Sequence, residues 1–201
     1  MRDGVIYVHG RGGCAEDARR FAPLFPGIEV AGLDYRARTP WEAREEFPAF
    51  FDRFRRTHGR VALIADSIGA YFAMHALYDR EIERACLISP IVDMEELIAG
   101  MMARAGVDER VLEKCGAVPT DEGELSWAYL SWVRAHPVVW RAKTAVLCGE
   151  RDALQSSEAV RGFAGRVGAS LAVMPGGEHW FHTGEQLAFL DAWLKKEIDF
   201  M

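Results

Sequence analysis

The chain has 201 residues, of which half are hydrophobic and 27% are charged, as in an ordinary globular domain with a full core. Its net charge of −6 argues against a nucleic-acid surface, which would need clustered basic side chains. No apolar run approaches the roughly 20 residues of a membrane-spanning helix, and we see no signal-peptide pattern at the N-terminus.

The four cysteines do not have the spacing of a metal site. Two of them, Cys86 and Cys148, fall within predicted strands, where a buried thiol packs as a small hydrophobic group. We therefore expect a reduced, cytoplasmic protein.

The chain opens with a predicted strand at residues 4–8, which runs directly into His9-Gly10-Arg11-Gly12-Gly13. Glycines directly after a strand allow the backbone to approach a ligand closely. The stretch is neither a Walker sequence nor Gly-x-Gly-x-x-Gly, so it does not match the usual phosphate-binding motifs. A helix at 15–24 and a short strand at 28–33 follow.

Residues 41–56 carry large apolar side chains at helical spacing, which predicts an amphipathic helix. Its aromatic residues are expected to pack in the core and not around a cofactor: Trp41, Phe47, Phe50, Phe51 and Phe54.

The next stretch changes from strand to helix within a few residues. An apolar strand is predicted at 61–65, followed by the turn Asp66-Ser67-Ile68-Gly69 and an alanine-rich helix to about residue 78. A serine at the apex of so sharp a turn stands clear of the fold and needs small residues two positions before and after it. Ala65 and Gly69 meet that requirement. The simpler alternative is a serine that only caps the helix.

About fifty residues separate the predicted strand at 85–89 from the next one at 145–148, although such connections usually take about 2–6 residues. Helices are predicted at 94–105 and 124–135, with a short turn at 108–115. Beyond this insert, the strand at 145–148 leads into Gly149-Glu150-Arg151-Asp152. A last strand at 171–174 leads into Gly177-Glu178-His179-Trp180-Phe181, and a helix at 186–198 closes the chain.

Strands that alternate with helices in this way predict an α/β fold, with a mostly parallel six-stranded sheet and helices on both faces. Neither a linker nor an internal repeat is visible, so residues 1–201 are expected to form one domain.

Five of these elements, in this order, resemble the α/β-hydrolase superfamily. Ala65-x-Ser67-x-Gly69 is similar to its nucleophile elbow, Gly-x-Ser-x-Gly, with alanine in place of the first glycine. The resemblance implies Ser67 as nucleophile, His179 as base and Asp152 as the acid that orients it. It also implies that the backbone N–H groups of Arg11 and Ile68 form the oxyanion hole, and that residues 91–143 form a helical lid. The two antiparallel strands usual at the N-terminus of the family are missing.

Each assignment has a rival. Asp66 could act as nucleophile, but Ile68 stands where that register needs a small residue. Asp93 is the second choice for the acid, with Glu150 also close to Asp152. His182 lies three residues beyond His179 and could replace it as the base, or pair with it on a metal for which no third ligand is evident. His9 is expected to brace its loop.

The resemblance implies a serine hydrolase that cleaves a small or medium carboxylic ester through an acyl-enzyme, without a metal or organic cofactor. Its partner would be a small ester-like molecule, bound in a pocket for which the candidates are Met101, Trp127, Trp132 and Trp180. The alternatives are a thioesterase, a lysophospholipase-like or aminopeptidase-like hydrolase, or a non-catalytic ligand-binding protein of this fold. The insert could instead be an extra layer on the sheet, and the sequence does not predict an oligomeric state.

Overall fold

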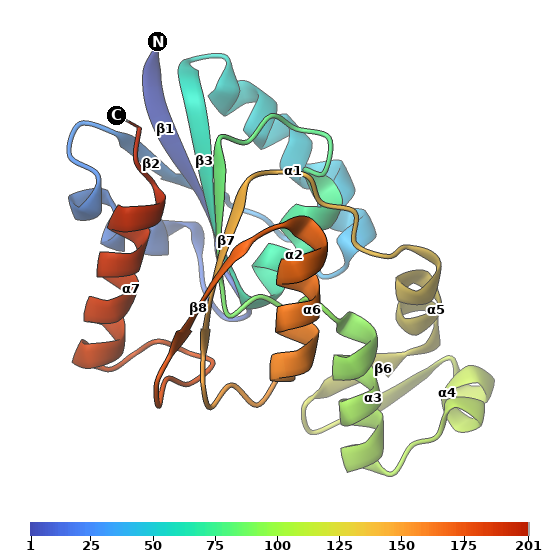
Figure 1. Ribbon diagram of the computed structural model, residues 1–201. Coiled ribbons are helices and arrows are strands. Elements are labelled where there is room, and N and C mark those ends of the chain that lie inside the picture. The colour runs from blue at the N-terminus through green and yellow to red at the C-terminus, as the bar shows by residue number, and fades with distance from the viewer. Residues whose placement is uncertain (201) are drawn as a thin grey trace.

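A twisted sheet of six parallel strands forms the centre of the protein, as the computed structural model shows for residues 1–200 (Figure 1). The strand order is β2-β1-β3-β4-β7-β8. The strands are β1 (Arg2–Val8), β2 (Glu29–Gly32), β3 (His58–Asp66), β4 (Arg84–Ile88), β7 (Thr144–Gly149) and β8 (Ser170–Met174). All neighbouring pairs run parallel, so the expected sheet is confirmed.

Helices cover both faces of the sheet because side chains alternate along each buried strand. Leu63 and Ala65 of β3 face one side, and Ala62 and Ile64 face the other. The first face is covered by α1 (Pro40–Arg55), α2 (Ser67–Ala76) and α6 (Ser157–Val167). The second is covered by α7 (Gly184–Glu197) and two short 3-10 helices, η1 (Ala15–Arg20) and η2 (Ala22–Leu24).

The single helix expected at 15–24 is therefore wrong. Its second half contains Pro23, which has no N–H to continue an α-helical ladder and whose ring crowds the preceding turn. The segment instead forms two short helices that meet at Phe21, which is buried against the sheet.

Helix α6 is a second difference, because no helix was predicted between β7 and β8. Its signals are present in the sequence. Ser156 caps it by accepting a hydrogen bond from the Ala159 N–H, and Gly168 ends it in the left-handed conformation. The apolar residues Val160, Phe163 and Ala164 lie three and four positions apart and are buried.

The insert between β4 and β7 lies at the carboxyl end of the sheet and contains its own small hairpin (Figure 1). It consists of α3 (Met94–Ala105), α4 (Glu109–Cys115), β5 (Ala117–Thr120), β6 (Gly123–Ser126) and α5 (Trp127–Ala135). Residues 108–115 were expected as a short turn, but 109–115 form the helix α4, which Asp108 caps. The helix expected at 124–135 starts only at Trp127, since the preceding residues pair with β5.

Among residues 1–200, no helix is long and apolar enough to cross a membrane.

Candidate active site

The turn from β3 to α2 holds Ser67 in a backbone conformation that serine rarely adopts. Its φ angle is 51°, in the left-handed region, where a side chain costs about 1–2 kcal/mol. The turn packs so closely on the loop after β1 that a Cβ added at Gly69 would lie 2.1 Å from the carbonyl oxygen of His9. Ala65 is completely buried. The close approach of the two loops thus needs glycine at position 69, and the core around Ala65 favours a small residue there.

Three side chains from three different loops form a continuous hydrogen-bonded chain. Ser67 Oγ lies 2.9 Å from His179 Nε2, and His179 Nδ1 lies 2.8 Å from Asp152 Oδ2. The Asp152 side chain is only 7% exposed, whereas that of His179 is 22% exposed. The acid is therefore buried behind the imidazole, and the imidazole faces the serine.

These contacts define the tautomer of the histidine. A carboxylate oxygen accepts hydrogen bonds, so the Nδ1 atom beside Asp152 carries the proton. Nε2 is then the acceptor, and the Ser67 hydroxyl donates to it. An imidazole placed in this way can accept the serine proton.

The loops after β7 and β8 fix the position of Asp152 relative to His179. The Arg151 N–H donates to the Gly177 carbonyl at 2.8 Å, and the Gly176 N–H donates to the carboxylate of Glu150 at 2.7 Å. Asp152 Oδ1 accepts from the Leu154 N–H at 2.9 Å. Glu150 therefore ties the two loops together, and the carboxylate that contacts His179 is that of Asp152.

Gln155 joins the same region to the loop after β4, and the sequence analysis missed it. Its side chain is buried and makes four hydrogen bonds to the backbone. The oxygen accepts from the N–H groups of Val92 and Asp93, and the nitrogen donates to the carbonyls of Asp93 and Leu154. Nothing in the local sequence distinguishes it from a surface glutamine.

The loop after β1 reaches Ser67 from the other side. A Cβ added at Gly10 would lie 3.1 Å from the Cβ of Ser67, so the two backbones are in close contact. Tyr35 holds this loop: its hydroxyl donates to the His9 carbonyl at 2.8 Å, and its ring stacks on the His9 ring at 4.3 Å. His9 Nδ1 in turn donates to the Gly10 carbonyl at 2.9 Å. Tyr35 is a second residue that the sequence analysis missed.

A cavity of about 610 Å³ adjoins this loop, within the size range of small-molecule sites. Its walls include both residues predicted to donate to an oxyanion, Arg11 and Ile68. Most of the apolar lining comes from α2 and from the insert, through α3 and β6: Ile68, Phe72, Met94, Leu97, Ile98, Met101 and Leu125. Charged residues lie at other points of the wall: Arg38, Glu122 and Glu124.

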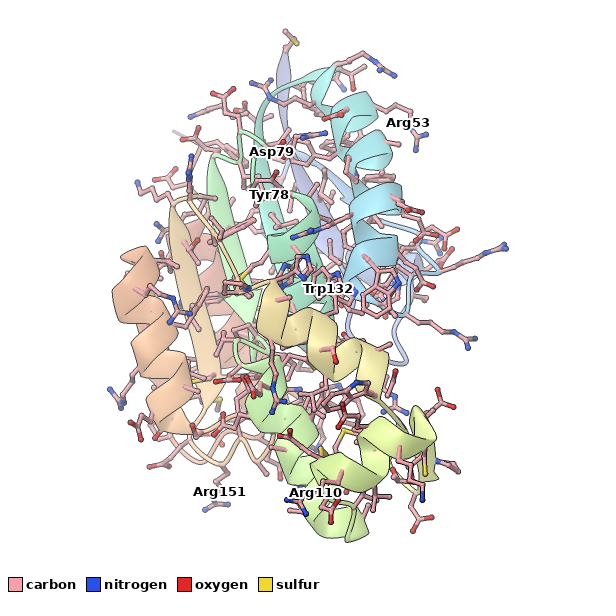
Figure 2. All side chains as sticks on the ribbon, turned by 90° about the vertical axis from the view of Figure 1, so that its right-hand side faces the viewer. Arg53, Tyr78, Asp79, Arg110, Trp132 and Arg151 are labelled. Carbon is pink, nitrogen blue, oxygen red and sulfur yellow. The ribbon has the colours of Figure 1, made fainter. Side chains whose placement is uncertain are left out.

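Of the four residues predicted to line a pocket, Met101 alone contributes to this cavity. Trp127, at the start of α5, is partly buried against the core. Trp132 packs between Trp41 and His75, where α5 faces α1 and α2 (Figure 2). Trp180 is 71% exposed and stacks on His182. None of these three side chains lines this cavity, so a role for them in substrate binding stays a prediction.

The structure also shows where other candidate residues lie. Asp93 caps α3, where its Oδ1 accepts from the Glu96 N–H at 2.8 Å. His182 Nδ1 donates to the Trp180 carbonyl at 2.8 Å and lies 3.5 Å from the carboxylate of Glu178. Arg151, beside Asp152, points outward from its loop (Figure 2).

The fold is that of the α/β hydrolases, as solved structures with similar folds show. Est1E from Butyrivibrio proteoclasticus superposes with a TM-score of 0.76 at 17% identity, covering 98% of this chain and 86% of its own. Alpha/beta hydrolase domain-containing protein 10 from mouse follows at 0.74 and 14% identity, covering 96% and 88%. The proline iminopeptidase-related protein from Thermus thermophilus gives 0.65 at 19% identity, covering 98% and 91%. Neither a family model nor a curated protein matches the sequence.

Proposed function

We propose that the protein is a serine hydrolase that cleaves a small or medium carboxylic ester through an acyl-enzyme. The observation that carries the proposal is the chain of short contacts from Asp152 through His179 to Ser67. A serine needs such a base to attack a carbonyl carbon at neutral pH.

The reaction has two steps. Ser67 gives its proton to Nε2 of His179 as its Oγ bonds to the carbonyl carbon, and the carbonyl electron pair moves onto the oxygen. The N–H groups of Arg11 and Ile68 stabilise this oxyanion, at about 3–4 kcal/mol per donor in comparable sites. The C–O bond then breaks, and the alcohol leaves with the proton from His179. A water molecule, deprotonated by the same imidazole, cleaves the acyl-enzyme and releases the acid.

The cavity supports the proposal that the protein binds the acyl part of its substrate. Its apolar side chains lie next to the oxyanion residues, where the carbon chain of a bound acyl group would start. Similar folds include an esterase from a marine microorganism, Est1E with bound ferulic acid, and a thioesterase domain from the curacin pathway. A carboxylic ester is our first choice, and thioesters and amides belong in the test.

We further propose that the chain is one domain in which residues 91–143 act as a lid. The insert supplies the outer wall of the cavity through α3 and the hairpin. Arg11 connects core and insert, since its guanidinium donates to the Glu122 carbonyl at 3.0 Å.

A cytoplasmic location is supported by the four cysteines, which are all unpaired.

The test is labelling of the purified protein with a fluorophosphonate, beside Ser67→Ala, His179→Ala and His182→Ala. We expect rapid labelling of the wild type and of His182→Ala, and loss of labelling in the other two. A panel of chromogenic esters of increasing acyl length, with one thioester and one anilide, then defines the substrate. A folded wild type that neither labels nor turns over would contradict the proposal and favour a ligand-binding protein.

A further inference from the structure

Gln155 is a buried polar residue that the proposed mechanism does not use, although it follows the proposed acid by three positions. Only 4% of it is exposed. A primary amide offers two donor hydrogens and an oxygen with two lone pairs, and here all four are hydrogen-bonded to backbone groups. The amide is therefore fixed in one orientation between two separate loops.

One of these loops carries Asp152. The Gln155 nitrogen donates to the Leu154 carbonyl at 3.0 Å, and the Leu154 N–H donates to Asp152 Oδ1 at 2.9 Å. The second carboxylate oxygen, Oδ2, accepts from His179 Nδ1 at 2.8 Å. The direction in which the carboxylate faces the imidazole thus depends on backbone that Gln155 holds in place.

The other loop follows β4 and contacts the nucleophile. The amide oxygen accepts from the N–H groups of Val92 and Asp93 at 2.8 and 2.7 Å, and the amide nitrogen donates to the Asp93 carbonyl at 3.0 Å. Directly before these residues, the Ile91 N–H donates to the Ser67 carbonyl at 3.2 Å. That carbonyl belongs to the same planar peptide group as the Ile68 N–H, so this loop contacts the peptide that carries a proposed oxyanion donor.

The loop after β4 is strained where it turns toward Ser67. Among residues 1–200, Ser67 and Ser89 are the non-glycine residues with positive φ, at 51° and 41°. They lie side by side, because each directly follows a residue of the pair formed by Asp66 of β3 and Ile88 of β4. Such strain persists only where the surrounding contacts enforce it. Gln155 supplies three hydrogen bonds to this loop, just beyond Ser89.

Together with the proposed triad, these contacts close a circuit. It leads from Ser67 through His179 to Asp152. From there it passes through Gln155 to the loop after β4, which returns to the Ser67 carbonyl. We propose that Gln155 is a positioning residue, which fixes the acid loop relative to the nucleophile and so keeps the three side chains within hydrogen-bonding distance. Its effect on turnover rests on the proposed function, but its effect on the position of Asp152 does not.

The first test compares Gln155→Met with the wild type. Methionine has a similar length but cannot make the four hydrogen bonds, so the acid loop loses its connection to the loop after β4. We expect kcat for a chromogenic ester to fall about ten- to a hundredfold, as when a catalytic group is slightly misplaced. KM should change little, because Gln155 does not line the cavity. Wild-type kcat in the folded variant would overturn the inference. Should Gln155→Met not fold, Gln155→Glu removes both donors, keeps the acceptor, and should lower kcat in the same way.

The matched control is Gln186→Met. Gln186 is also buried, and its side-chain oxygen accepts from the N–H groups of His182 and Thr183 at the start of α7. These contacts lie within one segment and do not join the acid loop to the loop after β4. The control should lower Tm, as Gln155→Met does, and keep kcat near that of the wild type. An equal loss of kcat in both variants would show that Gln155 acts through stability alone, against the inference.

A second measurement separates this inference from the proposed function. The Nδ1 proton of His179, hydrogen-bonded to Asp152, should give a proton NMR signal far downfield, which His179→Gln identifies by its loss. The signal should persist in Gln186→Met and disappear or move upfield in Gln155→Met. If no ester, thioester or anilide is hydrolysed, the proposed function fails, and this signal still decides whether Gln155 positions Asp152. If turnover is normal and the signal is unchanged in Gln155→Met, the inference alone fails.

Discussion

Two buried ionisable side chains affect the stability of the protein in opposite directions over the same pH range. Asp66 has its pKa raised from 3.8 to about 6 by burial. His75 is buried on α2 against Tyr71 and Trp132, and desolvation is the main reason that its pKa falls from 6.5 to about 4. Each shift corresponds to at most about 3 kcal/mol.

The direction of each effect on the free energy of unfolding depends on whether the native protein or the unfolded chain holds the proton. Between pH 4 and 6 the native protein keeps the Asp66 proton that the unfolded chain has lost, so the free energy of unfolding falls as the pH rises. Between pH 4 and 6.5 the unfolded chain protonates His75 and the native protein does not, so the free energy of unfolding rises with pH. We expect the wild type to show a shallow pH dependence in this window.

Single substitutions should expose each effect. In Asp66→Asn the free energy of unfolding should rise by up to about 3 kcal/mol from about pH 4 to 6.5, and in His75→Phe it should fall over the same range. Urea denaturation at half-unit pH steps measures both. Parallel curves for the wild type and the two variants would show that these two groups do not control the pH dependence.

At the scale of elements, the contact between the elbow and the loop after β1 depends on one glycine. A Cβ at Gly69 would meet the fixed backbone oxygen of His9 at 2.1 Å, and a backbone atom cannot swing aside. We expect Gly69→Ala to separate the two loops, to destabilise the protein by about 1–3 kcal/mol or more, and to reduce fluorophosphonate labelling at least tenfold. Labelling at the wild-type rate would mean that the loops do not need this close approach.

The matched control is Gly162→Ala in α6. Apart from its two chain neighbours and the backbone of its own helix, no atom lies within 4 Å of a Cβ added there, and the residue is exposed. Alanine should raise the free energy of unfolding by about 0.5–1 kcal/mol and leave labelling unchanged. Thermal melts of both glycine variants make the comparison.

Several of these elements could be predicted from the sequence. The strongest local signals are apolar strands that end in a recognisable feature: the glycine-rich loop, the elbow, Asp152 or His179. The structure brings these loops together. Residues 124–126 of β6 were expected as the start of a helix and β5 was not predicted, because both strands are short and mixed in composition and their pairing is closed by Gly123 at positive φ. Tyr35 and Gln155 act through backbone groups distant in sequence, so no motif identifies them.

At the scale of the whole molecule, the cavity forms where the insert packs against the core. A local sequence pattern does not encode how these two parts pack. Trp127 and Trp132 of the insert were expected to line it, but the insert contributes Tyr129 as its aromatic residue, and most of the apolar wall is aliphatic or methionine. Trp132 instead packs against α1, with the Arg44 guanidinium 5.0 Å from the centre of its ring. Trp132 therefore packs the insert against the core.

This arrangement predicts which substitution changes the preference for acyl length. Met101 lines the cavity, so Met101→Trp should fill part of the 610 Å³ and reduce kcat/KM for long acyl esters at least tenfold, with little effect on acetyl esters. Trp132 lies outside the cavity, so Trp132→Phe should lower stability without changing the ratio of long-chain to short-chain activity. The measurement is kcat/KM across a chromogenic ester series for both variants. A changed ratio in Trp132→Phe with none in Met101→Trp would place acyl binding elsewhere, because only a side chain that borders the bound chain can discriminate its length.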